Sequence, residues 1–233
     1  MKKIFSFLVI LFVLICSLSC TEKEKEDNPT EDQIYFKSVY KYLDDEKSVF
    51  VRVDYNKLQE IIDSKETVII MFGGSWCPNC QAIVKFVNEM AKKMYIDEIY
   101  CFDTKIDFDG EVRDISRCNT ESDTKMWSSI VNKIGFSSGN TVKKEDVEVL
   151  DEDGLTLSTM PVPTLVVLKD GKVANDGDKK VGQLTEELFY NPDTNTLWDS
   201  MTFDGSDVTE SFKTKLVSLF TVYDGCSNEE CSE

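Results

Sequence analysis

The stretch from Thr67 to Cys80, TVIIMFGGSWCPNC, joins an apolar run to two closely spaced cysteines. Residues 67–72 are rich in β-branched side chains, a pattern typical of a strand buried on both faces of a sheet. Residues 81–94 then carry apolar side chains at the spacing of an amphipathic helix. Cys77 and Cys80 therefore lie where a buried strand passes into a helix.

This position suits thiol chemistry. The first sulfur would sit at the helix N-terminus, where unpaired N–H groups and the helix dipole favour negative charge. Such an environment lowers the pKa of a thiol and makes it a better nucleophile and leaving group. The two intervening residues let Cys80 attack a mixed disulfide formed on Cys77, and Pro78 is tolerated at the start of the helix. The motif predicts a redox-active dithiol.

The strand–GGSWCPNC–helix segment resembles the active site of the thioredoxin superfamily. Residues 160–173, MPVPTLVVLKDGKV, are similar to the cis-proline loop, strand and hairpin of the same superfamily. The resemblance implies that Pro163 is the cis-proline facing the cysteines and that Val162 offers backbone hydrogen bonds to a substrate chain. It also implies an α/β fold, a three-layer α/β/α sandwich around a central mixed sheet. The residues expected to contact substrate are Trp76, Pro78, Asn79, Val162 and Pro163.

The chain departs from that pattern in two ways. The separation between Cys80 and Pro163 is far longer than in a minimal thioredoxin, which predicts an insertion at about 105–159 forming a subdomain or lid. Thioredoxins also place a buried acid six residues before the first cysteine, where this chain has Met71. Without that carboxylate, Cys80 needs another proton acceptor, either water or a nearby acid such as Asp103.

Further elements follow from periodicity and capping signals. Strands are expected at 49–53, 99–102 and 166–168, and Asp170–Gly171 predicts a hairpin turn. Helices are expected after Asp54, at 125–134 and at 206–223, the last capped by Ser206 or Asp207. Residues 34–43 fit either a strand or a short helix. This order of strands and helices indicates an α/β domain.

The N-terminus has the features of a targeting segment. Lys2 and Lys3 precede an apolar run that is short for a membrane span of about 20 residues but suits a signal peptide. The ending Ser17–Cys20 is similar to a bacterial lipoprotein signal, whose cysteine receives lipid, although Ser17 stands where leucine is usual. A simple cleaved signal and an uncleaved anchor are the alternatives. We expect a signal at 1–20, a polar flexible tether at 21–32 and a folded domain at 33–233.

Composition excludes several function classes. The chain has eight cysteines and no histidine, so Ser-His-Asp hydrolases, Cys-His proteases and His-ligated zinc or haem sites are ruled out. The formal net charge of −17 argues against nucleic acid as a partner. We expect no cofactor and no metal.

The cysteines leave several pairings open in an exported protein. Besides a redox pair, Cys77 and Cys80 could form an inert disulfide or half of a zinc site. Cys101 could pair with Cys118 or be a buried free thiol in its strand. Cys226 and Cys231 are expected to form a local disulfide rather than a second redox pair.

Together these features predict a lipid-anchored, extracytoplasmic thiol–disulfide oxidoreductase on a bacterial membrane. Its partners would be protein thiols and disulfides and a redox partner protein, with the membrane bound through lipidated Cys20. Asn79 stands where strong oxidants carry histidine, which favours a reductase or isomerase. The alternative is a binding or chaperone-like module on a thioredoxin scaffold. The exported setting resembles that of bacteriocin transport accessory proteins and thioredoxin-like lipoproteins.

Overall fold

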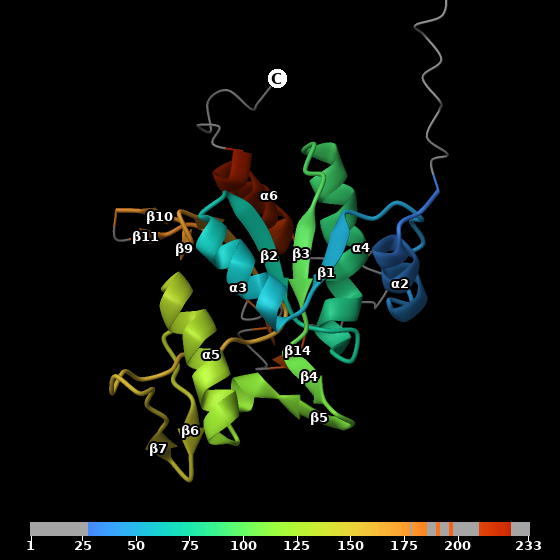
Figure 1. The fold of residues 1–233 in the computed structure, drawn as a ribbon. Helices are drawn as coiled ribbons and strands as arrows, with labels where there is room; N and C mark the ends of the chain where they lie inside the picture. The colour runs from blue at the N-terminus through green and yellow to red at the C-terminus, as the bar shows by residue number, and fades with distance from the viewer. Residues whose placement is uncertain (1–27, 178, 186–189, 192–195, 198–209, 225–233) are drawn as a thin grey trace, which may run out of the picture.

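The structure is a computed structural model that describes residues 28–177, 179–185, 190–191, 196–197 and 210–224 (Figure 1). The expected signal region with Cys20, the proposed caps Ser206 and Asp207, and the pair Cys226 and Cys231 lie outside these residues. Within the described chain, no helix combines the length and apolarity needed to cross a bilayer.

A six-stranded mixed sheet forms the centre of the fold, in the order β1-β3-β2-β8-β12, with β9 also pairing with β8. Its strands are β1 (Phe50–Val53), β2 (Val68–Phe72), β3 (Ile99–Phe102), β8 (Thr164–Lys169), β9 (Lys172–Val173) and β12 (Gln183–Leu184). β1, β3 and β2 are parallel, whereas β8 is antiparallel to β2. Phe72 at the end of β2 therefore pairs with Thr164 at the start of β8. This register brings the two thioredoxin-like motifs to the same edge of the sheet.

Helices cover both faces of the sheet, so the predicted three-layer α/β/α fold is confirmed. The helices of one layer are α2 (Glu31–Val39), α4 (Pro78–Lys93) and α6 (Glu210–Asp224); those of the other are α3 (Tyr55–Ser64) and α5 (Glu121–Ile134) (Figure 1). The central strand β2 contributes side chains to both layers, because successive side chains of a strand point to opposite faces of the sheet. Ile69 and Met71 pack with the first layer, while Ile70 and Phe72 pack with the second.

Residues 34–43, which fitted either a strand or a short helix, are helical as far as Val39. α2 begins at Glu31 because Thr30 forms a capping box with Gln33, each side chain accepting from the other residue's backbone amide. The helix therefore starts two residues inside the segment expected to be a tether. Asp32 in its first turn is paired with Arg52 of β1 at 2.8 Å, which fixes α2 against the sheet edge.

The long separation between the motifs is filled by regular elements rather than by an open loop. They are β4 (Lys105–Phe108), β5 (Glu111–Asp114), the 3₁₀ helix η1 (Ile115–Arg117), α5, β6 (Lys143–Lys144) and β7 (Val147–Glu148). Trp127 and Ile130 of α5 are fully buried with the side chains of β2 and β8. The insertion is thus built into the second layer of the domain.

Outside the main sheet lie two further short hairpins. They are β10 (Asn175–Asp176) with β11 (Lys179–Lys180), and β13 (Tyr190–Asn191) with β14 (Thr196–Leu197). Neither carries a residue of the candidate site.

Candidate active site

The two cysteines of the motif lie at the start of α4, as predicted. Cys77 is the N-cap, with extended backbone at φ −90° and ψ 120°, and Pro78 occupies the first turn. The amide of Cys77 donates to the Gly74 carbonyl at 3.0 Å, and the Gln81 amide donates to the Cys77 carbonyl at 3.1 Å. These bonds close the loop onto the helix and hold the Cys77 sulfur at the positive end of its dipole.

The two sulfurs occupy different environments. Cys77 retains 5% of its accessible surface and Cys80 none, and both are thiols rather than a disulfide. The hydrogen bond between the two thiols, together with burial, raises the pKa of Cys80 well above its usual value. A hydrogen bond with the backbone of Gly74 partly opposes this effect. Cys80 therefore keeps its proton at neutral pH.

The loop before β8 faces the cysteines. The Val162–Pro163 peptide bond is cis, which confirms that prediction. The Cys77 thiol donates to the Val162 carbonyl at a sulfur–oxygen distance of 3.4 Å. Val162 is half-buried and Pro163 is buried, so Val162 is the more accessible of the two.

Gly73 lets the second cysteine approach the end of β2. A Cβ atom at this position would lie 2.5 Å from the Cys80 sulfur, and its φ of +149° is unfavourable for other residues. The Gly73 amide donates to the Phe102 carbonyl of β3 at 3.0 Å. Glycine is therefore required here by both space and backbone conformation.

Trp76 flanks the cysteines and is held from two sides. Its indole Nε1 donates to Oδ1 of Asp103 at 2.8 Å, and the Lys105 ammonium lies 3.9 Å from the ring centroid. A Cβ atom at Gly74 would meet both the indole nitrogen and the Asp103 carboxylate at 2.3 Å, so this contact needs glycine. Trp76 keeps 38% of its surface exposed.

The predicted substrate-contacting residues are only partly accessible. Trp76 and Pro78 are exposed beside Cys77, with Val162 opposite. Asn79 keeps only 8% of its surface, so little of its side chain is available to a substrate.

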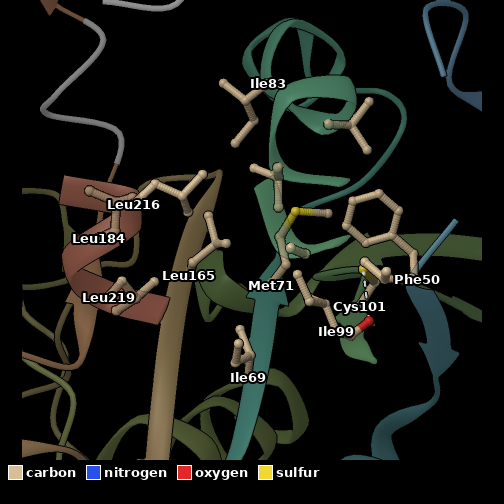
Figure 2. Close-up of a cluster of buried hydrophobic side chains, with 14 of the residues drawn as sticks. Phe50, Ile69, Met71, Ile83, Ile99, Cys101, Leu165, Leu184, Leu216 and Leu219 are labelled. Carbon is tan, nitrogen blue, oxygen red and sulfur yellow. Dashed lines mark hydrogen bonds between the residues drawn. The ribbon is translucent and has the colours of Figure 1, made fainter. Parts of the chain in front are cut away.

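Met71 is fully buried at the position where thioredoxins carry an acid. Figure 2 shows its side chain among the apolar residues of the first layer, near Phe50 of β1 and Cys101 of β3. A charged group would be costly there without a partner. Proton transfer from Cys80 therefore has to use groups outside the central strand.

Asp103 is the predicted alternative acceptor, and it lines a cavity of about 100 Å³ beside the active-site loop. The cavity is lined by Tyr35, Phe36, Tyr40, Arg52, Val53, Gly73, Gly74, Ser75, Cys101 and Asp103. Burial raises the pKa of Asp103, although hydrogen bonds from Trp76 and from the Lys105 amide act in the opposite direction. A carboxylate with a raised pKa accepts a proton more readily.

Sequence reasoning missed Tyr40 and Gln81 at this site. The side chain of Gln81 accepts from the Lys41 amide at 3.0 Å and donates to the carbonyls of Val39, at 3.0 Å, and Ser75, at 2.8 Å. It therefore joins the residues on either side of Tyr40 to the active-site loop. The amphipathic pattern of α4 placed Gln81 on a polar face but gave no sign of this link.

The two remaining described cysteines lie on opposite faces of the sheet. Cys101 packs in the first layer and Cys118 in the second, and both are thiols. The prediction that Cys101 could pair with Cys118 is therefore wrong, and the alternative prediction of a buried Cys101 thiol is confirmed. Burial raises the pKa of Cys101 well above its usual value and that of Cys118 to about 11.

Comparison with known proteins agrees with this geometry. No family model matches the chain. A curated relative, the thioredoxin H-type protein of Picea mariana, is 30% identical over 133 residues, which cover 57% of this chain and 70% of that protein. A strand–CxxC–helix site opposed by a cis-proline loop in an α/β/α sandwich defines a thioredoxin-like protein. The chain belongs to the thioredoxin family.

Proposed function

We propose that the protein is a thiol–disulfide oxidoreductase that acts on protein disulfides through Cys77 and Cys80. One observation carries this proposal: an N-capping Cys77 faces the Val162 carbonyl at 3.4 Å, with the fully buried Cys80 behind it. A nucleophile at a helix N-terminus and a second, protonated thiol behind it are the two groups that disulfide exchange needs.

The reaction has two exchange steps. The Cys77 thiolate attacks one sulfur of a substrate disulfide, forms a mixed disulfide and releases the other substrate sulfur as a thiolate. Cys80 then loses its proton and attacks the Cys77 sulfur, which forms the Cys77–Cys80 disulfide and releases the second substrate thiolate. The substrate gains two electrons, and a redox partner protein must supply two electrons to the Cys77–Cys80 disulfide to regenerate the dithiol. Trp76, Pro78 and Val162 border the site where the substrate chain would bind.

We infer that the reducing or isomerising direction is favoured. Strong oxidants of this kind stabilise the thiolate with a histidine between the cysteines, and Asn79 stands there instead. A reduction potential nearer to about −270 mV than to about −120 mV would support this direction.

Trapping of substrates tests the function directly. In a Cys80→Ser variant the second exchange step is lost, so mixed disulfides with partner proteins should accumulate on Cys77 and dissociate under reductant. The matched control is the double variant with Cys77→Ser, which should trap nothing. Absence of adducts, together with failure of the purified protein to reduce or oxidise a model disulfide, would refute the proposal.

Met71 favours one rival function. Its apolar side chain replaces an acid that assists catalysis in thioredoxins, as expected of a scaffold that binds extended chains without exchanging disulfides. A non-catalytic accessory module in peptide export is the form this rival would take. The two functions differ in whether they need Cys77 and Cys80. A module that only binds would keep its affinity for a partner when both cysteines are replaced by serine.

We propose that the protein is anchored by lipid outside the cytoplasm of a bacterial cell. The support is the signal-like segment 1–20 ending in Cys20 and the polar residues that follow it. A multiply acylated cysteine binds membranes stably because each buried CH₂ contributes about 0.8 kcal/mol. The wild-type chain should fractionate with membranes and incorporate labelled fatty acid, whereas Cys20→Ser should do neither. Equal fatty-acid labelling of the two proteins would contradict the anchor.

A further inference from the structure

The second exchange step needs a route for the Cys80 proton. Cys80 is fully buried, and its pKa is raised by the hydrogen bond with Cys77 and by burial. Met71 offers no basic atom on the adjacent strand. The attack on the mixed disulfide therefore waits for another group to remove the proton.

The cavity beside the active-site loop is lined by Asp103 at one end of such a route and by Gly73, the neighbour of Cys80, at the other. Gly73 lines the cavity, and the Cys80 sulfur is so close to Gly73 that no Cβ atom would fit between them. Asp103 lines the same cavity and supplies a carboxylate to its wall. The space, about 100 Å³, is large enough for one or a few water molecules beside polar groups.

Tyr40 contributes a phenol side chain to the wall of the same cavity. It follows α2 and is 3% exposed. Its ring stacks on Phe36 with centroids 5.7 Å apart. The Gln81 side chain bonds to the backbone on both sides of Tyr40 and to the Ser75 carbonyl of the active-site loop. The position of Tyr40 is thus fixed relative to Cys80 by the helix that carries Cys80.

The electrostatics agree with this placement. Burial raises the pKa of the Tyr40 hydroxyl above its ordinary value. The negative charges that Cys80, Cys101 and Asp103 can carry raise it further, with Cys80 the largest of the three. Tyr40 therefore stays a neutral hydroxyl, which can accept one hydrogen bond and donate another.

We propose that Tyr40 relays the proton of Cys80 to Asp103 through this cavity, replacing the buried acid that the central strand lacks. The proposal rests on the proposed oxidoreductase function. The Cys80 proton passes to the Tyr40 oxygen while the Tyr40 proton passes to the Asp103 carboxylate, directly or through one water molecule. The step leaves a Cys80 thiolate, an unchanged tyrosine and a protonated Asp103. The thiolate then attacks Cys77, and Asp103 returns its proton to solvent.

Other charged groups near the cavity are already engaged. Arg52 is paired with Asp32, and Lys105 lies over the Trp76 ring. The titratable groups that face the relay from the surrounding elements are Asp32 and Tyr35 of α2, Arg52 of β1, Cys77 at the N-cap of α4, Cys101 of β3, Lys105 of β4 and Asp114 of β5.

A two-phase thiol reaction isolates the relayed step. The reduced full-length protein is mixed with dithiobisnitrobenzoate, which releases one coloured thiolate when Cys77 attacks and a second when Cys80 resolves the adduct. In Tyr40→Phe the second phase should slow about 100-fold at neutral pH, since a positioned proton-transfer group contributes at least this much. Its rate should then rise with pH toward the wild-type value, because hydroxide replaces the relay. The first phase should be unchanged.

Three comparisons decide between outcomes. Asp103→Asn should slow the same phase, and the double variant with Tyr40→Phe should be no slower than the slower single variant, as expected for groups acting in series. Tyr42→Phe, which removes a hydroxyl two residues away, should behave as wild type. A wild-type second phase in Tyr40→Phe would overturn the relay, as would equal slowing of both phases. Failure of the wild-type protein to release any thiolate would instead refute the oxidoreductase function.

Discussion

The carboxylate of Asp103 is half-buried, contacts the Trp76 indole and lines the cavity beside the active-site loop. Burial raises the pKa of Asp103, so its carboxyl group holds a proton more tightly in the folded protein than in the unfolded chain. The stability that follows is complete below the unfolded-state pKa and is lost as pH rises through the folded-state pKa. The charged form needed for proton transfer is thus the form that costs stability.

The direction of this pH dependence can be tested with Asp103→Asn, which keeps an oxygen to accept a hydrogen bond from the Trp76 indole. Relative to wild type, the free energy of unfolding of the variant should increase between about pH 3 and pH 7, because only the wild type must ionise a half-buried carboxyl. Urea denaturation of both proteins at the two pH values measures the difference. A difference that stays constant with pH, or moves the other way, would contradict the raised pKa.

Sequence patterns identified the residues whose function depends on neighbours in the chain. Cys77, Cys80 and Pro163 belong to short motifs, and the structure places them together. Tyr40 and Gln81 were missed because Gln81 bonds to the residues beside Tyr40 only in the folded chain, for example to the Lys41 amide 40 residues away, and neither position has a periodic or motif signal. The pairing of Cys101 with Cys118 failed since spacing does not reveal which face of a sheet a side chain occupies.

Elements with strong periodicity were also predictable. α3, α4 and the buried strands β2 and β8 have continuous apolar patterns and lie where expected. α5 begins at Glu121, earlier than predicted, because its start is set by a capping box of Thr120 and Asp123 rather than by apolar residues. β4, β5 and β6 are short and mostly exposed, so alternation of apolar and polar residues could not identify them.

Gln81 and Asn88 are two of the polar side chains through which α4 binds the connection between α2 and β1. Asn88 is buried; its Oδ1 accepts from the Val49 amide at 2.9 Å and its Nδ2 donates to Asp45 at 2.8 Å. This contact fixes the entry into β1, and therefore the edge of the sheet beside the cavity.

Replacing Asn88 should weaken that connection. Asn88→Ala leaves the Val49 amide buried without its acceptor, which should lower the free energy of unfolding by about 1–3 kcal/mol. Lys85→Ala is the matched control on the same helix, since the pair it forms with Asp44 is exposed and should contribute at most about 1 kcal/mol. Denaturant titration measures both variants, and similar losses for the two would argue against this account.

The molecule as a whole is a sheet with two helical layers that share the side chains of the same strands. Because α5 of the insertion packs directly on this sheet, the insertion and the thioredoxin-like part should unfold as one cooperative unit. Cys101 and Cys118 report on this question independently, as each is a buried thiol in a different layer.

In a variant with Cys77→Ser and Cys80→Ser, both remaining described thiols should resist alkylation under native conditions. As urea is added, Cys101 and Cys118 should become reactive with the same midpoint, because opening either layer exposes the shared sheet. Mass spectrometry of alkylated peptides at each urea concentration gives the two curves separately. If Cys118 reacts at a clearly lower urea concentration than Cys101, the second layer opens by itself. The insertion would then be an independent unit, and its contacts with β2 and β8 would contribute little to the stability of the active-site layer.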